Sequence, residues 1–241
     1  MAIHGRGLAT ELVGDETISN YLSTHRLFRV LPEGVCRDLS AEVVERHYSK
    51  GHHLTYSGDL LNFIGIVKSG LVALSQIDTR GDDHALMALY PGDVLGLGAA
   101  VRRSRMSWTS TAMVDVQALI MRLDTFSDLY QRFPEFRHQV ACELANNVVR
   151  CGETALYFTL GPASSRVATF LLESAKAIGK QQGSSTINLS FSHQELADFL
   201  GMTRETVTRI LARLSRSGII ATDRNRVTVL NTEALREMAN G

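Results

Sequence analysis

The sequence predicts an α+β fold in three parts: an N-terminal antiparallel β-roll of the jelly-roll kind, one long helix, and a C-terminal winged helix-turn-helix. Turn dipeptides separate short apolar or alternating runs in the first half of the chain. After Phe133-Pro134 the apolar residues recur at steps of three and four, and further on two capped helical segments precede two short β-branched runs. Alternation is typical of strands and a period near 3.6 of helices, so these three observations predict the fold class.

Length and composition favour two folded domains. The chain has 241 residues, of which 44% are hydrophobic and 21% charged, enough for a core and too unbiased for general disorder. Lys+Arg 25 and Asp+Glu 25 cancel, which argues against a basic coat or membrane anchor along the whole length. The mostly apolar stretch Leu60–Val67 is far shorter than the ~18 residues of a membrane span. The N-terminus lacks the apolar stretch of a signal peptide, so we expect a cytoplasmic protein with no membrane partner.

The element patterns set the expected boundaries. Residues 1–24 show only a short helix near Glu16–Ser23 and are expected to form a loosely attached lead-in. Residues 25–133 carry turn signals about every 7 to 12 residues, as a β-roll does. The long helix is expected at 134–160, and the winged helix-turn-helix at 161–241, because Gly161-Pro162 interrupts the helix.

The long helix is expected to pair two copies of the chain. Pro134 suits its first turn, and its apolar stripe is nearly as narrow as a coiled-coil seam. Such a stripe packs against a partner helix more often than against its own domain, although the second arrangement stays open. We therefore predict a homodimer whose contacts come from Val140, Leu144, Val148, Cys151, Ala155 and Phe158.

The cysteines give no sign of a cofactor. Cys36, Cys142 and Cys151 are odd in number, widely spaced and without a C-x-x-C pair. This pattern excludes a disulfide framework and a four-thiolate zinc or iron–sulfur site within one chain. We expect buried, unreactive thiols and no metal site.

Two adjacent helices near the C-terminus have helix-turn-helix spacing. Ser192 and Glu195 form a capping box that opens the first helix, and Gly201 ends it. Thr203 caps a second helix, expected at Arg204–Arg216, after a turn of about three residues. The two runs that follow, on either side of a polar turn, read as a β-hairpin wing: Ile219–Thr222 and Val227–Leu230.

The second helix has two chemically different faces. At about 100° per residue, its apolar residues Val207, Ile210, Leu211 and Leu214 lie opposite a polar set: Arg204, Glu205, Thr208 and Arg209. Arginine can donate two hydrogen bonds to guanine and glutamate can accept one from cytosine, so this face has the groups that major-groove readout needs. The alternative is a solvated face with a Glu205–Arg209 pair. The capped helix before it and the wing after it favour contacts with DNA bases.

The charge distribution supports contact with phosphates. Residues 162–241 hold ten Lys+Arg and seven Asp+Glu, a net charge of +3, and six of those arginines lie between positions 204 and 226. A local basic surface on a neutral protein fits a duplex as partner. The expected phosphate contacts are Ser192, Thr203, Arg213, Arg216, Arg224 and Arg226.

The segment from Phe191 to Arg209 closely resembles the DNA-binding signature of the Crp/Fnr superfamily of bacterial transcription regulators, and the resemblance extends from about Leu27 to Met238. It implies a cyclic-nucleotide-binding-like β-roll as effector sensor, a dimerisation helix, a DNA-binding winged helix and RNA polymerase as a partner. In that family the residues matching Glu205 and Arg209 read bases. Arg204 is typical of the cyclic-AMP-receptor branch, whereas the sensor half is similar to Fnr and FixK-like members.

The sensor half departs from members that bind cyclic AMP. Their cassette has a glutamate for the ribose hydroxyl, followed by an arginine for the phosphate. Here Leu97 stands at the glutamate position and Met106–Thr109 fill the position of the arginine pair. Cyclic AMP is therefore disfavoured. The effector pocket implied by the resemblance consists of Gly96, Leu97, Gly98, Trp108 and Thr109.

Other sensor chemistries stay open to different degrees. An Fnr-type iron–sulfur cluster is excluded, because only Cys36 precedes residue 100. Haem-sensing members use histidine or cysteine ligands, so haem stays an alternative. The remaining readings are another small effector, or none. The histidine candidates for haem are His25, His47, His52, His53 and His84.

Two rival classes of protein fit less well. A cupin-type metal enzyme would need converging histidines, but the adjacent His52 and His53 point to opposite faces of a strand. A cyclic-nucleotide module of a larger signalling assembly is disfavoured by the missing glutamate and the attached winged helix. We therefore expect no enzyme. We expect a sequence-specific transcription regulator that binds inverted-repeat DNA as a homodimer.

Overall fold

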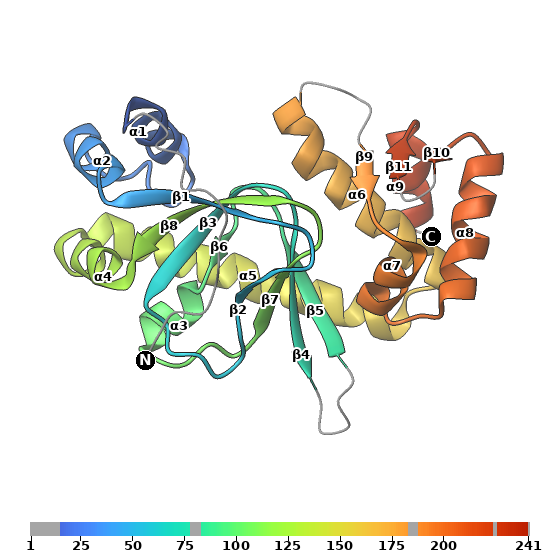
Figure 1. The fold of residues 1–241 in the computed structure, drawn as a ribbon, viewed down its shortest axis with the longest axis horizontal. Coiled ribbons are helices and arrows are strands. Elements are labelled where there is room, and N and C mark those ends of the chain that lie inside the picture. Colours follow the sequence, from blue (N-terminus) through green and yellow to red (C-terminus); the bar gives the residue numbers. More distant parts are fainter. Residues whose placement is uncertain (1–14, 78–82, 183–187, 224–225, 241) are drawn as a thin grey trace.

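A computed structural model describes residues 15–77, 83–182, 188–223 and 226–240 (Figure 1). Its N-terminal half contains two four-stranded antiparallel sheets with the strand orders β1-β8-β3-β6 and β2-β7-β4-β5. The strands are β1 (Val43–Tyr48), β2 (His53–Thr55), β3 (Phe63–Ser69), β4 (Val72–Ile77), β5 (Asp83–Leu89), β6 (Val94–Leu95), β7 (Thr109–Ala112) and β8 (Val116–Arg122).

The two sheets form the predicted β-roll because their inner faces are apolar. One core cluster takes residues from both sheets, among them Val67 of β3 and Val72 of β4, which are almost completely buried. Ala112 and Val116, at 1% exposed each, continue this cluster on β7 and β8. The antiparallel registers and the alternating burial of β7 confirm the β-roll in the predicted half of the chain.

Four helices surround the first sheet: α1 (Asp15–Thr24), α2 (Glu33–Ser40), α3 (Leu97–Arg102) and α4 (Leu123–Arg132). Helix α1 lies where a short helix was predicted, but the loose attachment predicted for it is wrong. Ile18 and Leu22 are 4% and 0% exposed and pack in one cluster with Phe28 and Phe126. The sequence pattern did not predict α2, α3 or α4. Residues 1–14 of the lead-in lie outside the described residues.

A single long helix, α5 (Pro134–Leu160), links the β-roll to the C-terminal half, with the bounds predicted from the sequence. Figure 1 shows it running from beside α4 to the beginning of α6 (Ala163–Gln182). The break at Gly161-Pro162 separates α5 from α6 and redirects the chain.

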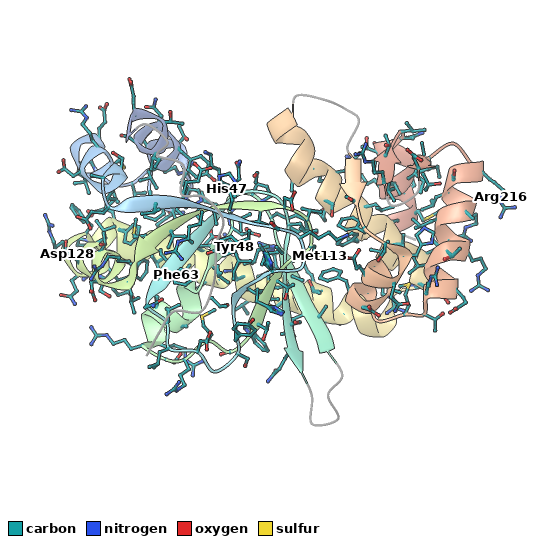
Figure 2. The ribbon with its side chains drawn as sticks, viewed as in Figure 1. His47, Tyr48, Phe63, Met113, Asp128 and Arg216 are labelled. Atoms are coloured by element: carbon teal, nitrogen blue, oxygen red, sulfur yellow. The ribbon has the colours of Figure 1, made fainter. Side chains whose placement is uncertain are left out.

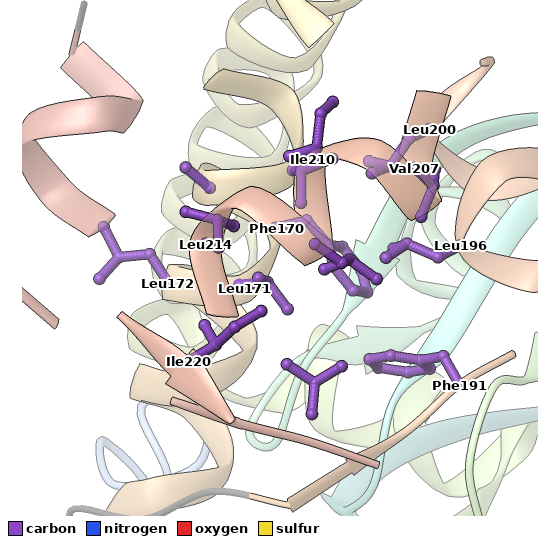
Figure 3. Packing of buried hydrophobic residues seen from close by; sticks show 14 of the residues in the cluster. Phe170, Leu171, Leu172, Phe191, Leu196, Leu200, Val207, Ile210, Leu214 and Ile220 are labelled. Carbon is purple, nitrogen blue, oxygen red and sulfur yellow. The ribbon is translucent and has the colours of Figure 1, made fainter. Parts of the chain in front are cut away.

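The C-terminal half is a winged helix-turn-helix. It contains β9 (Asn188–Ser190), α7 (His193–Leu200), α8 (Arg204–Arg216), β10 (Ile220–Asp223), β11 (Arg226–Val229) and α9 (Thr232–Asn240). The strands form a sheet of order β10-β11-β9. Figure 3 shows apolar side chains of α6, α7 and α8 meeting around Phe170 and Phe191. The ring centroids of these two residues lie 5.2 Å apart. The fold class predicted from the sequence is confirmed. Helix α9 was not predicted, although Asn231 caps it by accepting a hydrogen bond from Ala234 N at 3.0 Å.

The C-terminal half packs directly on the β-roll. Leu71 and Ala88 belong to the same buried cluster as the core of the winged helix, and Met113 lies at this boundary in Figure 2. Lys50 Nζ donates to Glu195 Oε2 at 2.8 Å and to the carbonyl oxygen of Ser190 at 3.2 Å. The helices among the described residues are too short or too polar to cross a membrane.

Candidate nucleic-acid interface

Side-chain caps fix the beginning of both helices of the helix-turn-helix. Ser192 Oγ accepts a hydrogen bond from Glu195 N at 3.1 Å, and Glu195 Oε2 accepts one from Ser192 N at 2.7 Å. Thr203 Oγ1 accepts from Thr206 N at 3.3 Å at the start of α8. Gly201 has φ 60°, a left-handed conformation that glycine adopts without steric cost. The predicted capping box, turn and second cap are therefore all present.

Helix α8 presents one buried face and one exposed face, as predicted. Val207, Ile210, Leu211 and Leu214 are at most 6% exposed and form part of the domain core. The opposite face exposes Arg204, Glu205, Thr208 and Arg209. Two guanidinium groups, one carboxylate and one hydroxyl thus lie together in solvent on a rigid helix. That is the set of donors and acceptors that base edges in a major groove can match.

His193 belongs to this surface, although sequence reasoning did not single it out. Its Nδ1 lies 2.9 Å from Thr208 Oγ1, so the first residue of α7 contacts the exposed face of α8. Sequence spacing alone does not show this contact, because it depends on the angle between the two helices. The imidazole therefore fixes the orientation of the Thr208 hydroxyl.

The described residues predicted to contact phosphates lie at the two helix caps, on α8 and on the wing. Arg213, Arg216 and Arg226 are exposed, and Figure 2 places Arg216 at the outer edge of α8. The hydroxyls of Ser192 and Thr203 accept backbone N–H groups at the two caps, and Thr203 Oγ1 also lies 3.0 Å from Thr206 Oγ1. Arg224 lies outside the described residues.

The apolar stripe of α5 divides into an inward part and an outward part. Val140 is 1% exposed in the β-roll core, so its predicted contact with a partner is wrong, and the half-buried Leu144 packs on the same cluster. Cys151 and Ala155 are exposed, and Val148 is 72% exposed. The prediction missed two exposed neighbours, Val149 and Leu156, at 59% and 61%. The Phe158 side chain lies outside the described part of the chain.

Ion pairs determine which side of α5 faces the β-roll. Arg26 Nε donates to both oxygens of Glu143 on α5, at 2.9 and 2.8 Å. Asp93 Oδ1 accepts from Arg26 Nη2 at 2.6 Å and from Arg150 Nη1, also on α5, at 2.9 Å. Burial opposes the charge on Arg26, but the hydrogen bonds to Glu143 and Asp93 outweigh it and raise the pKa of the guanidinium. Since Glu143 and Arg150 are held inward, Val148 and Val149 face solvent.

The five residues predicted for an effector pocket differ in burial. Leu97 is 2% exposed and packs in the same core cluster as Phe28 and Phe126, whereas Trp108 is 36% exposed. Thr109 Oγ1 accepts a hydrogen bond from Ser57 N at 3.2 Å at the roll surface. Gly96 begins α3 with φ 85°, and a Cβ placed on Gly98 would lie 4.0 Å from the Leu144 side chain. An effector pocket formed by these residues therefore stays a prediction.

Four of the five histidine candidates for haem have described side chains, and of these four His25 is buried. Its Nδ1 accepts from Leu27 N at 3.2 Å and its Nε2 lies 2.9 Å from the Gly92 carbonyl oxygen, so both ring nitrogens are used. Burial lowers the pKa of this imidazole. His53 Nδ1 contacts Thr111 Oγ1 at 2.9 Å, and His47 lies 3.8 Å from Glu45 Oε1. His52 is exposed, and the side chain of His84 lies outside the described part.

The cysteines differ from expectation in exposure. Cys36 is buried, and burial raises the pKa of its thiol. Cys142 is half-buried and Cys151 is exposed, so the prediction of buried thiols is wrong for the two on α5. Within the described ranges, no group of three His, Cys, Asp or Glu side chains is placed to hold a metal ion.

A β-roll joined by a long helix to a winged helix with an exposed cationic face defines a class of protein: DNA-binding transcription regulators with a cyclic-nucleotide-binding-like domain. Residues 45–133 match the family model of the cyclic nucleotide-binding domain, and residues 165–238 match that of the Crp-like helix-turn-helix domain. The chain belongs to the Crp/Fnr superfamily of transcription regulators.

Individual relatives support the same assignment. The chain is 29% identical over 211 residues to the cyclic AMP receptor protein of Thermus thermophilus, covering 87% of this chain and 94% of the relative. It is 26% identical to the transcriptional activator protein FnrL of Cereibacter sphaeroides, over 77% of this chain and 75% of that one. The structure of FixK2 from Bradyrhizobium japonicum shares the fold, with a TM-score of 0.70, 21% identity, and coverage of 81% and 96%.

Proposed function

We propose that this regulator binds inverted-repeat DNA sites as a homodimer, with α8 of each copy in the major groove. The exposed set on α8 carries the proposal: Arg204, Glu205, Thr208 and Arg209 lie opposite a fully packed apolar face. A rigid, capped helix that presents base-reading groups suits direct readout.

The base preferences follow from the chemistry of these side chains. Arg209 suits a guanine and Glu205 a cytosine, so each half-site should contain G·C pairs at the positions they meet. Arg204 tilts the preference toward the TGTGA type of half-site that the family resemblance implies. Exposed arginines at the end of α8 and on the wing, Arg216 and Arg226, would contact phosphates on either side.

The exposed part of α5 supports pairing of two copies. Val148, Val149 and Leu156 are large apolar side chains, each more than half exposed, on one helix. Burying them against the same helix of a second copy would create a two-fold dimer. The two recognition helices would then read half-sites about one helical turn, roughly 10 bp, apart.

The effector, where there is one, is proposed to be a small molecule other than cyclic AMP. Leu97 stands where cyclic-AMP-binding members carry a glutamate, and its side chain is 2% exposed in the core. An apolar, buried side chain cannot accept a hydrogen bond from a ribose hydroxyl. Calorimetric titration of the whole protein with cyclic AMP should show no binding. Haem is less well supported, because both nitrogens of His25 already have partners.

Fluorescence anisotropy with paired duplexes tests the proposed function. A labelled duplex with two inverted half-sites should bind two protein copies, and one with the second half-site scrambled should bind at least tenfold more weakly. Equal affinity for the two duplexes would contradict binding as a dimer to inverted repeats. We further propose a cytoplasmic location and a contact with RNA polymerase, both of which rest on the family assignment.

A further inference from the structure

A cationic and aromatic surface lies on the β-roll, well away from α8. We call it the Trp108 patch; it consists of Tyr56, Leu60, Arg102, Arg103, Arg105 and Trp108. Tyr56, Leu60 and Trp108 are 52%, 72% and 36% exposed, and the three arginines are exposed as well. Figure 1 places α3, which the patch adjoins, and α8 in different halves of the molecule. DNA held by α8 therefore does not account for this surface.

Hydrogen bonds hold the two segments of the patch side by side. Gly58 N donates to the Met106 carbonyl oxygen at 2.8 Å, and Met106 N donates to the Asp59 carbonyl oxygen at 2.9 Å. Arg105 Nη1 donates to the Gly58 carbonyl oxygen at 2.8 Å, and Leu60 pairs with Arg105 in an isolated β-bridge. The segments 56–60 and 105–108 therefore form one pre-organised surface, and Arg102 and Arg103 precede the second segment by a few residues.

The charge of the patch is strongly one-sided. Three guanidinium groups stand against the single carboxylate of Asp59, whose Oδ2 accepts a hydrogen bond from Tyr56 N at 3.1 Å within its own turn. Guanidinium groups bind carboxylates with two parallel hydrogen bonds. The matching partner is therefore acidic.

Arg103 adopts a backbone conformation that favours glycine. Its φ is 51°, and it is the one non-glycine residue with positive φ in the ranges that the structure describes. It ends α3, where Arg103 N donates to the Ala100 carbonyl oxygen at 3.3 Å and Ser104 N donates to that of Ala99 at 3.0 Å. Glycine would serve this turn with less strain. The chain therefore accepts backbone strain at position 103 and keeps an arginine there. This points to a functional role for the Arg103 guanidinium.

We propose that the Trp108 patch docks an acidic segment of another protein, with carboxylates on the arginines and an apolar side chain on Trp108, Leu60 and Tyr56. Tryptophan, tyrosine and arginine are the residues that dominate binding energy at protein interfaces. Exposed aromatic rings beside guanidinium groups supply both the apolar centre and the charged rim of such an interface. The proposal does not rest on the DNA-binding function and can be tested apart from it.

The experiment selects peptides from a library of random 12-residue sequences displayed on phage, over the immobilised whole protein. Enriched peptides should combine Asp or Glu with a leucine or aromatic residue. A synthetic, tryptophan-free copy of the best peptide should then be titrated while the emission of Trp108, the one tryptophan of the chain, is followed. We expect saturable quenching or a blue shift that weakens in higher salt.

Matched variants separate docking from folding. Arg103→Gly relieves the backbone strain, so it should keep or raise the melting temperature of the protein. It should also weaken the affinity for the peptide about tenfold, the loss expected for one charge-assisted contact. Arg105→Glu should weaken it further. Arg37→Gln removes an exposed arginine on α2, with 74% of its side chain accessible, and should leave binding unchanged.

Other results would overturn the proposal. One such result is that no enriched peptide binds the wild type more tightly than it binds Arg103→Gly. A second is the enrichment of basic peptides. A third is peptide binding that leaves the Trp108 emission unchanged. A shift of that emission by single-stranded dT20 would assign the patch to nucleic acid. A shift that depends on protein concentration would assign it to a second copy. Loss of DNA binding alone would affect only the proposed function.

Discussion

Under the proposed function, single side chains on α8 decide whether DNA binding is sequence-specific or merely electrostatic. Arg209 lies on the exposed face with Glu205 and Thr208, whereas Arg216 lies at the far end of the same helix. The two arginines carry the same charge, but only Arg209 belongs to the set proposed to meet base edges. Their substitutions should therefore have different signatures.

The first prediction compares these two arginines. Arg209→Ala should lose about 1 to 3 kcal/mol of discrimination per half-site, because a two-bond contact with guanine is removed. Arg216→Ala should weaken all sequences about equally and lower the salt dependence of binding by about one phosphate contact. Salt titrations with matched and mismatched duplexes measure both effects. Unchanged sequence preference in Arg209→Ala would show that α8 is not the reading element.

The second prediction concerns the contact between His193 and Thr208. Because the imidazole lies 2.9 Å from the Thr208 hydroxyl, it should orient the donor at one base position. His193→Ala and Thr208→Val should each broaden the preference at the same position, and the double variant should be no broader than Thr208→Val alone. Affinities for duplexes varied one base pair at a time give the coupling. Additive effects at different positions would contradict it.

The third prediction concerns acid stability and His25. The folded protein lowers the pKa of this imidazole chiefly by burial, so its neutral form is favoured in the folded state. The stability it contributes is present above the unfolded pKa, about 6.5, and is lost as the pH falls through the lower folded value. Melting temperatures between pH 8 and pH 5 should decline for the wild type. His25→Gln should decline less steeply, and equal slopes would count against the assignment.

Among the elements, the bounds of α5 were predictable from the sequence, but the side chains that it packs against were not. Its bounds were predictable because Pro134 and Gly161-Pro162 are local signals. Its partners were not, because a period of three and four describes any apolar stripe on a helix. Ion pairs of Glu143 and Arg150, more than fifty residues distant from Asp93 and Arg26 in sequence, turn Val140 inward and Val148 outward.

The fourth prediction uses the two sides of α5. Val148→Asp with Leu156→Asp should give a folded monomer that melts somewhat lower than the dimer, because both side chains are exposed in one chain and only the stabilisation from association is lost. Val140→Asp should instead unfold the β-roll, since a buried carboxylate without a partner costs several kcal/mol. Light scattering and thermal denaturation distinguish the two outcomes. A dimer that survives the double substitution would place the interface elsewhere.

For the other elements too, features set by neighbouring residues were predictable from the sequence, and features set by residues distant in the sequence were not. The caps at Ser192 and Thr203 predicted α7 and α8 closely, because capping involves residues three positions apart. Helix α3 follows the glycine at position 96 and was missed, because its six residues are too few to show a helical period. Leu97 could be placed at the missing glutamate position, but the structure was needed to show it inside the core.

At the scale of the whole molecule, the winged helix and the β-roll share a core. Leu71 and Ala88 of the roll lie in the cluster of Phe170, and Lys50 pairs with Glu195 of the capping box. The β-roll therefore contacts α7, the first helix of the helix-turn-helix, directly.

The central claim is that two copies of α8 read an inverted repeat through their exposed face. Its most direct test, and the fifth prediction, is selection of binding sites from random duplexes with the wild type and Arg209→Ala side by side. The wild type should select two inverted half-sites with centres about 10 bp apart and a G·C pair at the Arg209 position, a preference that the variant loses. Selected sites without inverted symmetry, or the same preference in both proteins, would contradict the claim.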